Sequence, residues 1–183
     1  MRKILVAVAM APVMAFGTLA IAVTAVASFT PVAAVTSVPS TGTGTGVGDI
    51  PAGLVGVYQS AAATCPGLNW TILAAIGKIE SNHGRSTLPG VHSGQNSAGA
   101  GGPMQFLAST WAAYGVDGNH DGVADRYNPV DAIYGAARYL CANGAGDPRR
   151  LRGAIYRYNH AVWYVEDVLQ QAGRYVMAYR HVN

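Results

Sequence analysis

From residue 51 onwards, apolar side chains recur at intervals of three and four residues, a spacing typical of amphipathic helices. The pattern predicts six helices, most of them bounded by glycine, proline or asparagine. They cover residues 52–64, 69–81, 103–114, 128–140, 147–156 and 161–179. A glycine-rich loop over residues 84–102 separates the second helix from the third. No segment alternates polar and apolar residues as a strand does, so we expect a mainly α fold.

The second predicted helix carries the residue of greatest chemical interest, Glu80. Asn69 is suited to cap the start of this helix, and Gly84 to adopt the left-handed conformation that closes its last turn. Glu80 lies next to Ile76 on the apolar stripe, whereas Lys78 lies on the opposite side. We therefore expect a buried carboxyl group, and burial favours the protonated form that a general acid requires. The helix alone leaves a second interpretation open, a structural ion pair between Glu80 and an arginine.

The first 50 residues differ in composition from the rest of the chain. Arg2 and Lys3 precede an almost wholly apolar stretch, with Ala25-Val26-Ala27 as a site for signal peptidase. Because this stretch is also long enough to cross a bilayer, residues 1–27 are interpreted as a signal peptide or an N-terminal membrane anchor. Residues 28–50 are rich in Thr, Gly, Ser and Pro, which predicts a flexible linker. Residues 51–183 then form one domain, outside the cytoplasm.

The cysteine count and the charge agree with an exported domain. Cys65 and Cys141 are the only cysteines, and export favours a disulfide between them, although two buried free thiols also fit the sequence. The chain has 12 basic and 9 acidic residues, and Arg2 and Lys3 account for two of the basic ones. The remainder forms no basic cluster beyond an arginine-rich stretch that we interpret as a solvated helix face, so nucleic acid is not an expected partner.

A segment between the third and fourth predicted helices resembles the first half of an EF-hand loop. Oxygen-bearing groups stand at relative positions 1, 3, 5 and 7 of this segment, and a glycine stands at position 6. These are Asp117, Asn119, Asp121, the backbone carbonyl of Val123, and Gly122. Position 12 is Asn128 instead of glutamate, and the next carboxylate is Asp131. The pattern alone leaves open a calcium site and an ordinary capped turn, and either would hold the start of the following helix.

Four short motifs occur in a characteristic order along the predicted domain. They are Ile79-Glu80-Ser81, Gly102-Pro103-Met104-Gln105-Phe106, Asp131-Ala132-Ile133, and Tyr158-Asn159 with Tyr164-Val165. Together with the calcium-like loop, they resemble the catalytic domain of lytic murein transglycosylases, and most closely the membrane-bound lytic transglycosylase B type. The resemblance spans about residues 71–168. It implies a lysozyme-like helical domain of the goose-type or soluble lytic transglycosylase kind, with an EF-hand-like loop.

The resemblance also implies roles for individual residues. Glu80 matches the single catalytic acid/base of the family. The implied substrate-binding residues are Ser97, Gln105, Phe106, Tyr139, Tyr158, Asn159 and Tyr164. The implied ligands of a structural Ca²⁺ are Asp117, Asn119, Asp121, the Val123 carbonyl and Asp131. No catalytic cofactor is implied. The expected partner is peptidoglycan, and we expect a monomer that is secreted, or anchored on the outer face of the cytoplasmic membrane.

The residues are compatible with this chemistry. Cleavage of a glycosidic bond usually takes two carboxylates, but a substrate with a 2-acetamido group can supply the second function itself. We therefore predict cleavage of the β-1,4 bond between N-acetylmuramic acid and N-acetylglucosamine, with closure of a 1,6-anhydro ring. A lysozyme-like peptidoglycan hydrolase and a non-catalytic, calcium-stabilised wall-binding module remain as alternatives. The tyrosines named above also fit a role as core aromatics, and we expect His83, His92, His120 and His160 at the surface.

Overall fold

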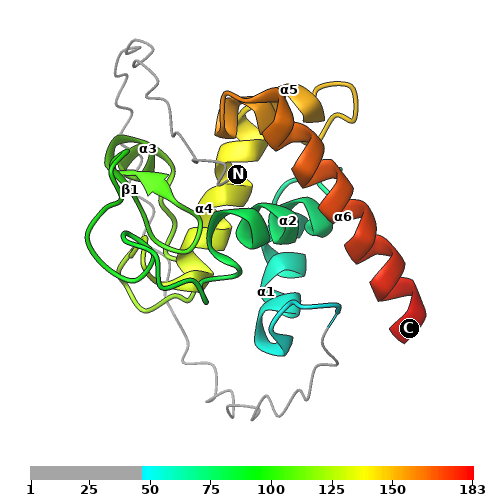
Figure 1. The fold of residues 1–183 in the computed structure, drawn as a ribbon, viewed down its shortest axis with the longest axis horizontal. Helices are drawn as coiled ribbons and strands as arrows, with labels where there is room; N and C mark the ends of the chain where they lie inside the picture. Colours follow the sequence, from blue (N-terminus) through cyan, green and yellow to red (C-terminus); the bar gives the residue numbers. More distant parts are fainter. Residues whose placement is uncertain (1–46) are drawn as a thin grey trace, which may run out of the picture. The chain divides into compact units, whose positions relative to one another are not determined.

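The structure is a computed structural model and describes residues 47–183, which form six helices and one two-stranded sheet (Figure 1). The helices are α1 (Ala52–Ala63), α2 (Trp70–Ser81), α3 (Ala108–Tyr114), α4 (Pro129–Ala142), α5 (Leu151–Tyr158) and α6 (Val162–Val182). The strands are β1 (Ala100–Gly101) and β2 (Phe106–Leu107). The prediction of a mainly α fold is confirmed. The predicted signal peptide or anchor lies outside the described residues, as does most of the predicted linker.

Helix α2 packs against three of the other helices, α1, α4 and α6 (Figure 1). Nine of its twelve residues are buried. Small residues let the neighbouring helices approach closely: a Cβ atom on Gly77 would lie 2.3 Å from the Tyr58 hydroxyl of α1. The burial of Ile72, Leu73 and Ile76 supplies the hydrophobic stabilisation that holds the helices together.

Both ends of α2 are closed by asparagine. The Asn69 side chain accepts a hydrogen bond of 3.0 Å from the Thr71 amide, which confirms the predicted N-cap. At the other end Asn82, with φ of 55°, takes the left-handed position that we assigned to Gly84. The amide of His83 then donates to the Gly77 carbonyl at 2.8 Å, as in a Schellman motif. The helix ends at Ser81 as predicted, but the prediction of Gly84 as its cap was wrong because asparagine also tolerates the left-handed conformation, and the cap lies two residues before Gly84.

The third helix starts later than predicted, and a hairpin takes the place of its first turn. Strand β1 pairs with β2 in antiparallel orientation, with Ala100 opposite Leu107 and Gly101 opposite Phe106. Between the strands, Gln105 has φ of 51°, which no helix accommodates. The prediction of a helix from residue 103 was therefore wrong. The prediction that the domain has no strands was also wrong, at this hairpin.

Other boundaries also differ from the prediction, and α6 continues to Val182, three residues beyond its predicted end. Residues 147–150 form a turn in which the Arg150 amide donates to the Asp147 carbonyl at 2.9 Å, so α5 begins at Leu151 and not at residue 147. At the start of the domain, Val47 and Ile50 are 1% and 3% exposed and belong to the hydrophobic core. The packed part of the chain therefore extends upstream of residue 51, into the end of the predicted linker.

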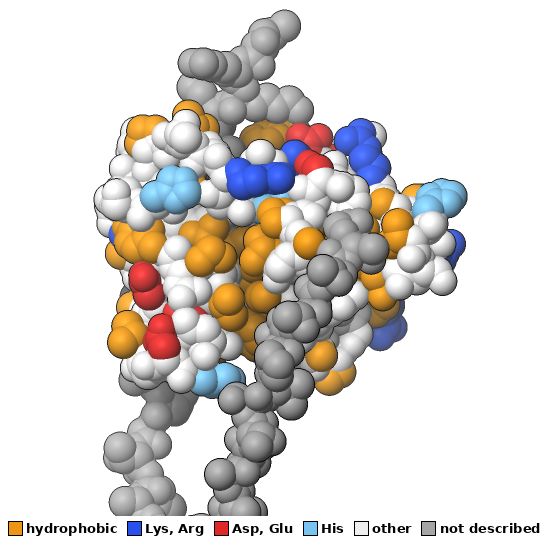
Figure 2. Space-filling model, turned by 90° about the horizontal axis from the view of Figure 1, so that it is seen from below, with side chains coloured by type: hydrophobic (Ala, Val, Ile, Leu, Met, Phe, Trp, Pro, Cys, Tyr) orange, Lys and Arg blue, Asp and Glu red, His pale blue; other side chains and the backbone are white. Residues whose placement is uncertain are grey.

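Hydrophobic and charged side chains are unevenly distributed over the surface. Figure 2 shows one face, on which hydrophobic side chains gather in a central hollow and charged side chains lie at its margins. Among residues 47–183, no helix combines the length and the apolar character that a membrane span requires. The fold thus places an apolar depression on this face, whereas its charges are peripheral.

A disulfide joins α1 to α4. Cys65, one residue beyond the α1 C-cap, is bonded to Cys141 in the last turn of α4, with 5.6 Å between their Cα atoms. The bond spans 76 residues of sequence and encloses α2, the hairpin and the EF-hand-like loop. The predicted pairing is therefore present, and among the described residues there is no free cysteine.

Replacing both Cys65 and Cys141 by alanine should lower the free energy of unfolding by about 4 kcal/mol, because the disulfide closes a long loop in the unfolded chain. Urea unfolding of the oxidised wild type and of the double variant measures this difference. Dithiothreitol should destabilise the wild type and leave the variant unchanged. Identical midpoints for oxidised and reduced wild type would contradict the prediction.

Candidate active site

Glu80 lies in the last turn of α2 and is only 9% exposed. Its Oε1 atom accepts a hydrogen bond of 2.6 Å from the Tyr164 hydroxyl on α6. Burial raises the pKa of Glu80 to about 7, and the hydrogen bond from Tyr164 acts in the opposite direction but is the weaker effect. The predicted burial is confirmed. Among the described residues no lysine or arginine forms an ion pair with Glu80, so the structural ion pair is not what holds it there.

Three tyrosines from three helices meet beside Glu80. The rings of Tyr158 and Tyr164 are stacked with centroids 6.5 Å apart, and Tyr139 contacts Tyr158 edge-on at 5.5 Å. The Tyr158 hydroxyl donates to the Met104 carbonyl at 2.8 Å. Burial, followed by the proximity of the Glu80 carboxyl, raises the pKa of both Tyr158 and Tyr164 well above the ordinary value. Both therefore remain hydroxyl donors at neutral pH.

Phe106 extends this aromatic cluster from the hairpin. Its ring lies 5.9 Å from that of Tyr158 and 5.3 Å from that of Trp111. Tyr139 anchors the opposite side, because its hydroxyl donates to the Arg157 carbonyl at 2.7 Å. The structure thus brings together five of the residues that the resemblance implied: Glu80, Phe106, Tyr139, Tyr158 and Tyr164.

The remaining implied substrate residues are placed differently. The Gln105 side chain is folded into its own loop, where it accepts from Asn96 Nδ2 at 3.0 Å and donates to the Gly102 carbonyl at 2.7 Å. Ser97 is exposed. Asn159 is 6% exposed and caps the C-terminus of α5, directly after Tyr158. Gln105 and Asn159 therefore adjoin the aromatic cluster in sequence, next to Phe106 and Tyr158, whereas Ser97 does not.

Asn96 organises the glycine-rich loop and was missed by the sequence analysis. Its Oδ1 atom accepts hydrogen bonds from the amides of Ala98 and Ala100, while its amide nitrogen donates to Gln105. The signal was available, because an asparagine among glycines is the usual centre of such turns. These three hydrogen bonds hold the part of the loop that contains Ser97, the residue after Asn96.

Ser81 was also missed, although it belongs to the same motif as Glu80. Its hydroxyl donates to the Pro103 carbonyl at 2.6 Å and accepts from the Gly84 amide at 2.7 Å. The residue following the buried carboxyl group therefore ties the end of α2 to the turn between β1 and β2. This bond fixes the position of the turn that contains Met104 relative to the end of α2.

One expectation about the histidines was wrong. His83 is 4% exposed and its ring nitrogens contact the hydroxyls of Tyr58 and Tyr175, each at 2.9 Å. Sequence periodicity could not reveal this, because His83 follows the end of α2 and its partners lie 25 and 92 residues away.

The EF-hand-like loop is held together by its own side chains. The Asp117 carboxylate accepts from the amides of Asp121 and Gly122, at 3.1 and 2.9 Å. Asp121 in turn accepts from the Val123 amide and from the Asn119 side chain, at 2.9 and 2.8 Å. The side chains at positions 1, 3 and 5 are thus neighbours, as the pattern predicted.

Asp131 completes this loop from the first turn of α4 and is fully buried. Its carboxylate accepts hydrogen bonds from the amides of Gly118, Asn119 and Asp125, at 2.9–3.2 Å. The oxygen donor set of the loop suits a hard cation. As arranged here, however, the carboxylates face backbone amides, and residues 47–183 contain no group of three acidic, histidine or cysteine side chains placed to hold a metal ion.

The pH dependence of stability should report the environment of Glu80. Its pKa rises from an ordinary 4.5 to about 7 on folding, so between these values the folded state holds a proton that the unfolded chain has lost. The contribution of Glu80 to the free energy of unfolding should therefore fall by about 3 kcal/mol as the pH rises from about 4.5 to about 7. The buried His83, whose pKa is lowered from an ordinary 6.5 to about 4, contributes a change of opposite sign over an overlapping range. Urea unfolding of the wild type and of Glu80→Gln at several pH values isolates the Glu80 contribution, because the difference in free energy of unfolding between the two proteins should change by about 3 kcal/mol over this range.

Glu166→Gln is the matched control, because Glu166 is the only other glutamate of the chain and is exposed on α6. This variant should keep the wild-type profile between pH 4.5 and 7. A wild-type profile in the Glu80 variant would show that the carboxyl group titrates normally.

Comparisons with known proteins bear on this arrangement. The family model of the transglycosylase SLT domain matches residues 92–148. This segment includes Gln105, the EF-hand-like loop and Tyr139, but begins after Glu80. No curated protein matches the chain significantly.

Solved structures of similar fold include two lytic transglycosylases. Soluble lytic transglycosylase SltB1 from Pseudomonas aeruginosa has a TM-score of 0.59 and 18% identity, over 69% of this chain and 76% of that one. Escherichia coli Slt35 in complex with calcium has a TM-score of 0.57 and 18% identity, over 69% and 72% of the two chains. Slt35 in complex with bulgecin A has a TM-score of 0.54 and 19% identity, over 66% and 71%. The chain thus contains a segment that matches the transglycosylase SLT domain, and its fold is that of lytic transglycosylases, as its motifs predicted.

Proposed function

We propose that the protein cleaves the β-1,4 bond between N-acetylmuramic acid and N-acetylglucosamine in peptidoglycan and closes a 1,6-anhydro ring on the muramic residue. The observation that carries this proposal is the buried Glu80 carboxyl group, whose pKa of about 7 leaves a large protonated fraction at neutral pH. A group with that pKa can donate a proton and later accept one under the same conditions. An exposed glutamate, ionised at neutral pH, could not serve as the donor.

In the proposed reaction, Glu80 acts twice. It first donates its proton to the bridging oxygen, so that the bond to the muramic C1 atom breaks and N-acetylglucosamine leaves as an alcohol. The resulting Glu80 carboxylate is stabilised by the hydrogen bond from Tyr164. It then accepts the proton of the muramic C6 hydroxyl, whose oxygen bonds to C1. The proton balance closes, and Glu80 is again protonated.

The second carboxylate of ordinary glycosidases has no evident counterpart beside Glu80. Glu166 is exposed and pairs with Arg152. Asp49 pairs with Lys78, and the aspartates of the EF-hand-like loop are engaged with backbone amides. We therefore assign the stabilisation of the positive C1 centre to the 2-acetamido oxygen of the substrate.

The proposed substrate contacts come from the aromatic cluster and its neighbours. We assign contacts with the sugar to Phe106 and the three tyrosines, of which Tyr158 is the least buried and has the most surface to offer. Asn159, next to Tyr158, is the amide best placed to bind the acetamido group, and Gln105 can do so only after giving up its bond to Asn96. Ser97 remains a prediction for the outer part of the site.

The proposed setting is the bacterial cell envelope. We infer a monomer that is secreted, or held on the outer face of the cytoplasmic membrane by residues 1–27, and that acts on peptidoglycan strands. The pairing of Cys65 with Cys141 supports an oxidising compartment. No catalytic cofactor enters the proposed reaction.

We also propose that the EF-hand-like loop binds Ca²⁺ for a structural purpose. A protein of similar fold, Slt35, has been solved in complex with calcium, and the oxygen donor set of this loop suits that ion. The proposed ligands are Asp117, Asn119, Asp121, the Val123 carbonyl and Asp131. Ion binding requires the carboxylates of Asp117 and Asp121 to exchange their amide partners for the cation.

Glu80→Gln should reduce the release of 1,6-anhydro-muropeptides from purified peptidoglycan by about 100-fold or more, because the amide cannot donate or accept the reaction's proton. Mass spectrometry of the products measures this, with Glu166→Gln as the control that should retain wild-type activity. Reducing sugar ends in place of anhydro ends would establish the hydrolase instead. Undiminished digestion by Glu80→Gln would refute the role of Glu80.

Calcium should raise the melting temperature of the protein, by an amount equivalent to about 2–3 kcal/mol at a concentration 100 times the Kd. Asp121→Ala should remove this shift, because it deletes a ligand at the centre of the loop. Asp147→Ala, a matched change outside the loop, should retain it. Calorimetry in calcium and in chelator compares the three proteins, and an identical melting temperature of the wild type in both would count against the site.

A further inference from the structure

The turn that follows α2 has an unusual backbone. Asn82, His83 and Gly84 are consecutive and have φ values of 55°, 59° and 79°. A left-handed conformation is ordinary for glycine and tolerated by asparagine, but it is uncommon for histidine. Such a residue persists only where its surroundings hold it, and conformations of this kind gather near functional sites. The side chain of His83 is therefore the place to look for what holds the turn.

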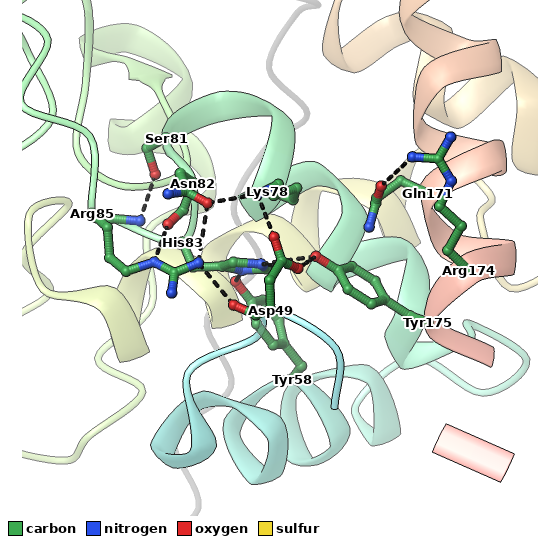
Figure 3. Close-up of polar contacts among 11 residues, drawn as sticks. Asp49, Tyr58, Lys78, Ser81, Asn82, His83, Arg85, Gln171, Arg174 and Tyr175 are labelled. Atoms are coloured by element: carbon green, nitrogen blue, oxygen red, sulfur yellow. Dashed lines mark hydrogen bonds and ion pairs between the residues drawn. The ribbon is translucent and has the colours of Figure 1, made fainter. Parts of the chain in front are cut away.

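His83 is fixed between two helices (Figure 3). One ring nitrogen, Nδ1, contacts the Tyr58 hydroxyl on α1, and the other, Nε2, contacts the Tyr175 hydroxyl on α6. Tyr175 donates its own proton to Asp49 Oδ1 at 2.8 Å, so it can only accept from His83. Burial lowers the pKa of His83 to about 4, so the ring is neutral at neutral pH. Its proton therefore lies on Nε2, and Nδ1 accepts from Tyr58.

These contacts form a directed chain of hydrogen bonds that ends in a charge. The chain runs from Tyr58 through His83 and Tyr175 to the Asp49 carboxylate, which forms an ion pair with Lys78 of α2 (Figure 3). Arg85, which follows the turn, donates to the Asp49 backbone carbonyl at 2.7 Å. Each member has a defined donor or acceptor role, so removal of one hydroxyl leaves a buried polar group of a neighbour unpaired.

Both the His83–Tyr175 contact and the Glu80–Tyr164 contact connect the end of α2 to α6. Glu80 and His83 are three residues apart at the end of α2, and their partners Tyr164 and Tyr175 are eleven residues apart on α6. Eleven residues are about three turns of helix, so both tyrosines lie on one face of α6. Helix α6 is thus joined to the end of α2 by two hydroxyl contacts, one at Glu80 and one at His83.

The same turn also faces the substrate side of the domain. The Ser81 hydroxyl bridges the Gly84 amide and the Pro103 carbonyl. The next carbonyl, that of Met104, accepts from Tyr158. A displacement of the turn would therefore move both Glu80 and Tyr158.

We propose that His83 and Tyr175 are positioning residues, which hold the turn after α2 and the face of α6 so that the Tyr164 hydroxyl stays on Glu80. They do not touch the reacting atoms. The inference rests on the proposed role of Glu80. It adds that the chain from Tyr58 through His83 and Tyr175 to Asp49 supports Glu80. The role of His83 and Tyr175 is to keep the Tyr164 hydroxyl and the Glu80 carboxyl at hydrogen-bonding distance.

Tyr175→Phe in the full chain tests this, because it removes one hydroxyl and keeps the ring. We expect kcat on peptidoglycan to fall between about 10-fold and about 100-fold, as for a displaced catalytic group, with KM within about twofold of wild type. Tyr179→Phe is the matched control: the same change one turn further along α6, where the ring packs on Trp70. This control should keep wild-type kcat.

The titration of the Glu80 carboxyl by ¹³C NMR gives a readout that needs no activity. Its midpoint should move by at least about half a pH unit in Tyr175→Phe and remain in place in Tyr179→Phe. Tyr164 and Tyr158 are the titratable groups that face Glu80, and neither is altered by these changes. Asp49→Ala, at a partly exposed carboxylate, removes the acceptor of the Tyr175 hydroxyl and serves as a second variant if Tyr175→Phe does not fold, and the same shift is expected.

A lower melting temperature with wild-type kcat and a wild-type Glu80 midpoint would overturn the positioning role, because it would leave only a structural one. If the wild type shows no activity on peptidoglycan, the proposed function fails, and the NMR midpoint alone decides the inference. A displaced midpoint then supports it, and an unchanged midpoint refutes it.

Discussion

The structure depends on one buried contact, the hydrogen bond between the Glu80 carboxyl and the Tyr164 hydroxyl. Removal of a carboxylate from water is costly, and a single neutral donor returns only part of that cost. Burial therefore prevails over the hydrogen bond, and the pKa of Glu80 rises. A lysine or arginine in place of Tyr164 would reverse the balance and keep the carboxylate ionised. The neutrality of its partner is what makes Glu80 a proton donor.

This contact in turn constrains how α2 and α6 pack. A bond of 2.6 Å between them exists only if the helix surfaces approach closely. On α2, Ala74, Ala75 and Gly77 are buried and small. The most severe constraint is at Gly77, where any side chain would meet the Tyr58 hydroxyl, which is the first donor in the chain through His83. The packing of the core and the polar contacts at the end of α2 are therefore set by the same few residues.

Much of this could be predicted from the sequence where the determining interactions are local. The Asn69 cap, the helical spacing and the side of α2 on which Glu80 lies depend on neighbours within one or two turns. The failures are of another kind. His83 is buried by partners 25 and 92 residues away, and Gln105 takes a left-handed backbone conformation in the turn between two paired strands. No pattern within a window of a dozen residues contains that information. The family motifs supplied part of it, but only for residues that belong to a motif.

A comparison of the two buried carboxylates shows why only one is suited to proton transfer. Asp131 is fully buried, and three backbone amides of the EF-hand-like loop donate to its two oxygens. These three amides hold both carboxylate oxygens in place, so Asp131 is an acceptor that shapes the loop around it. Glu80 has one described donor, a side-chain hydroxyl, and a raised pKa. A carboxyl group with few donors can lose and regain a proton at low cost, whereas one enclosed by backbone amides serves the fold. Both carboxyl groups are buried, so it is the number and kind of their hydrogen-bond donors that distinguishes the proposed catalytic Glu80 from the structural Asp131.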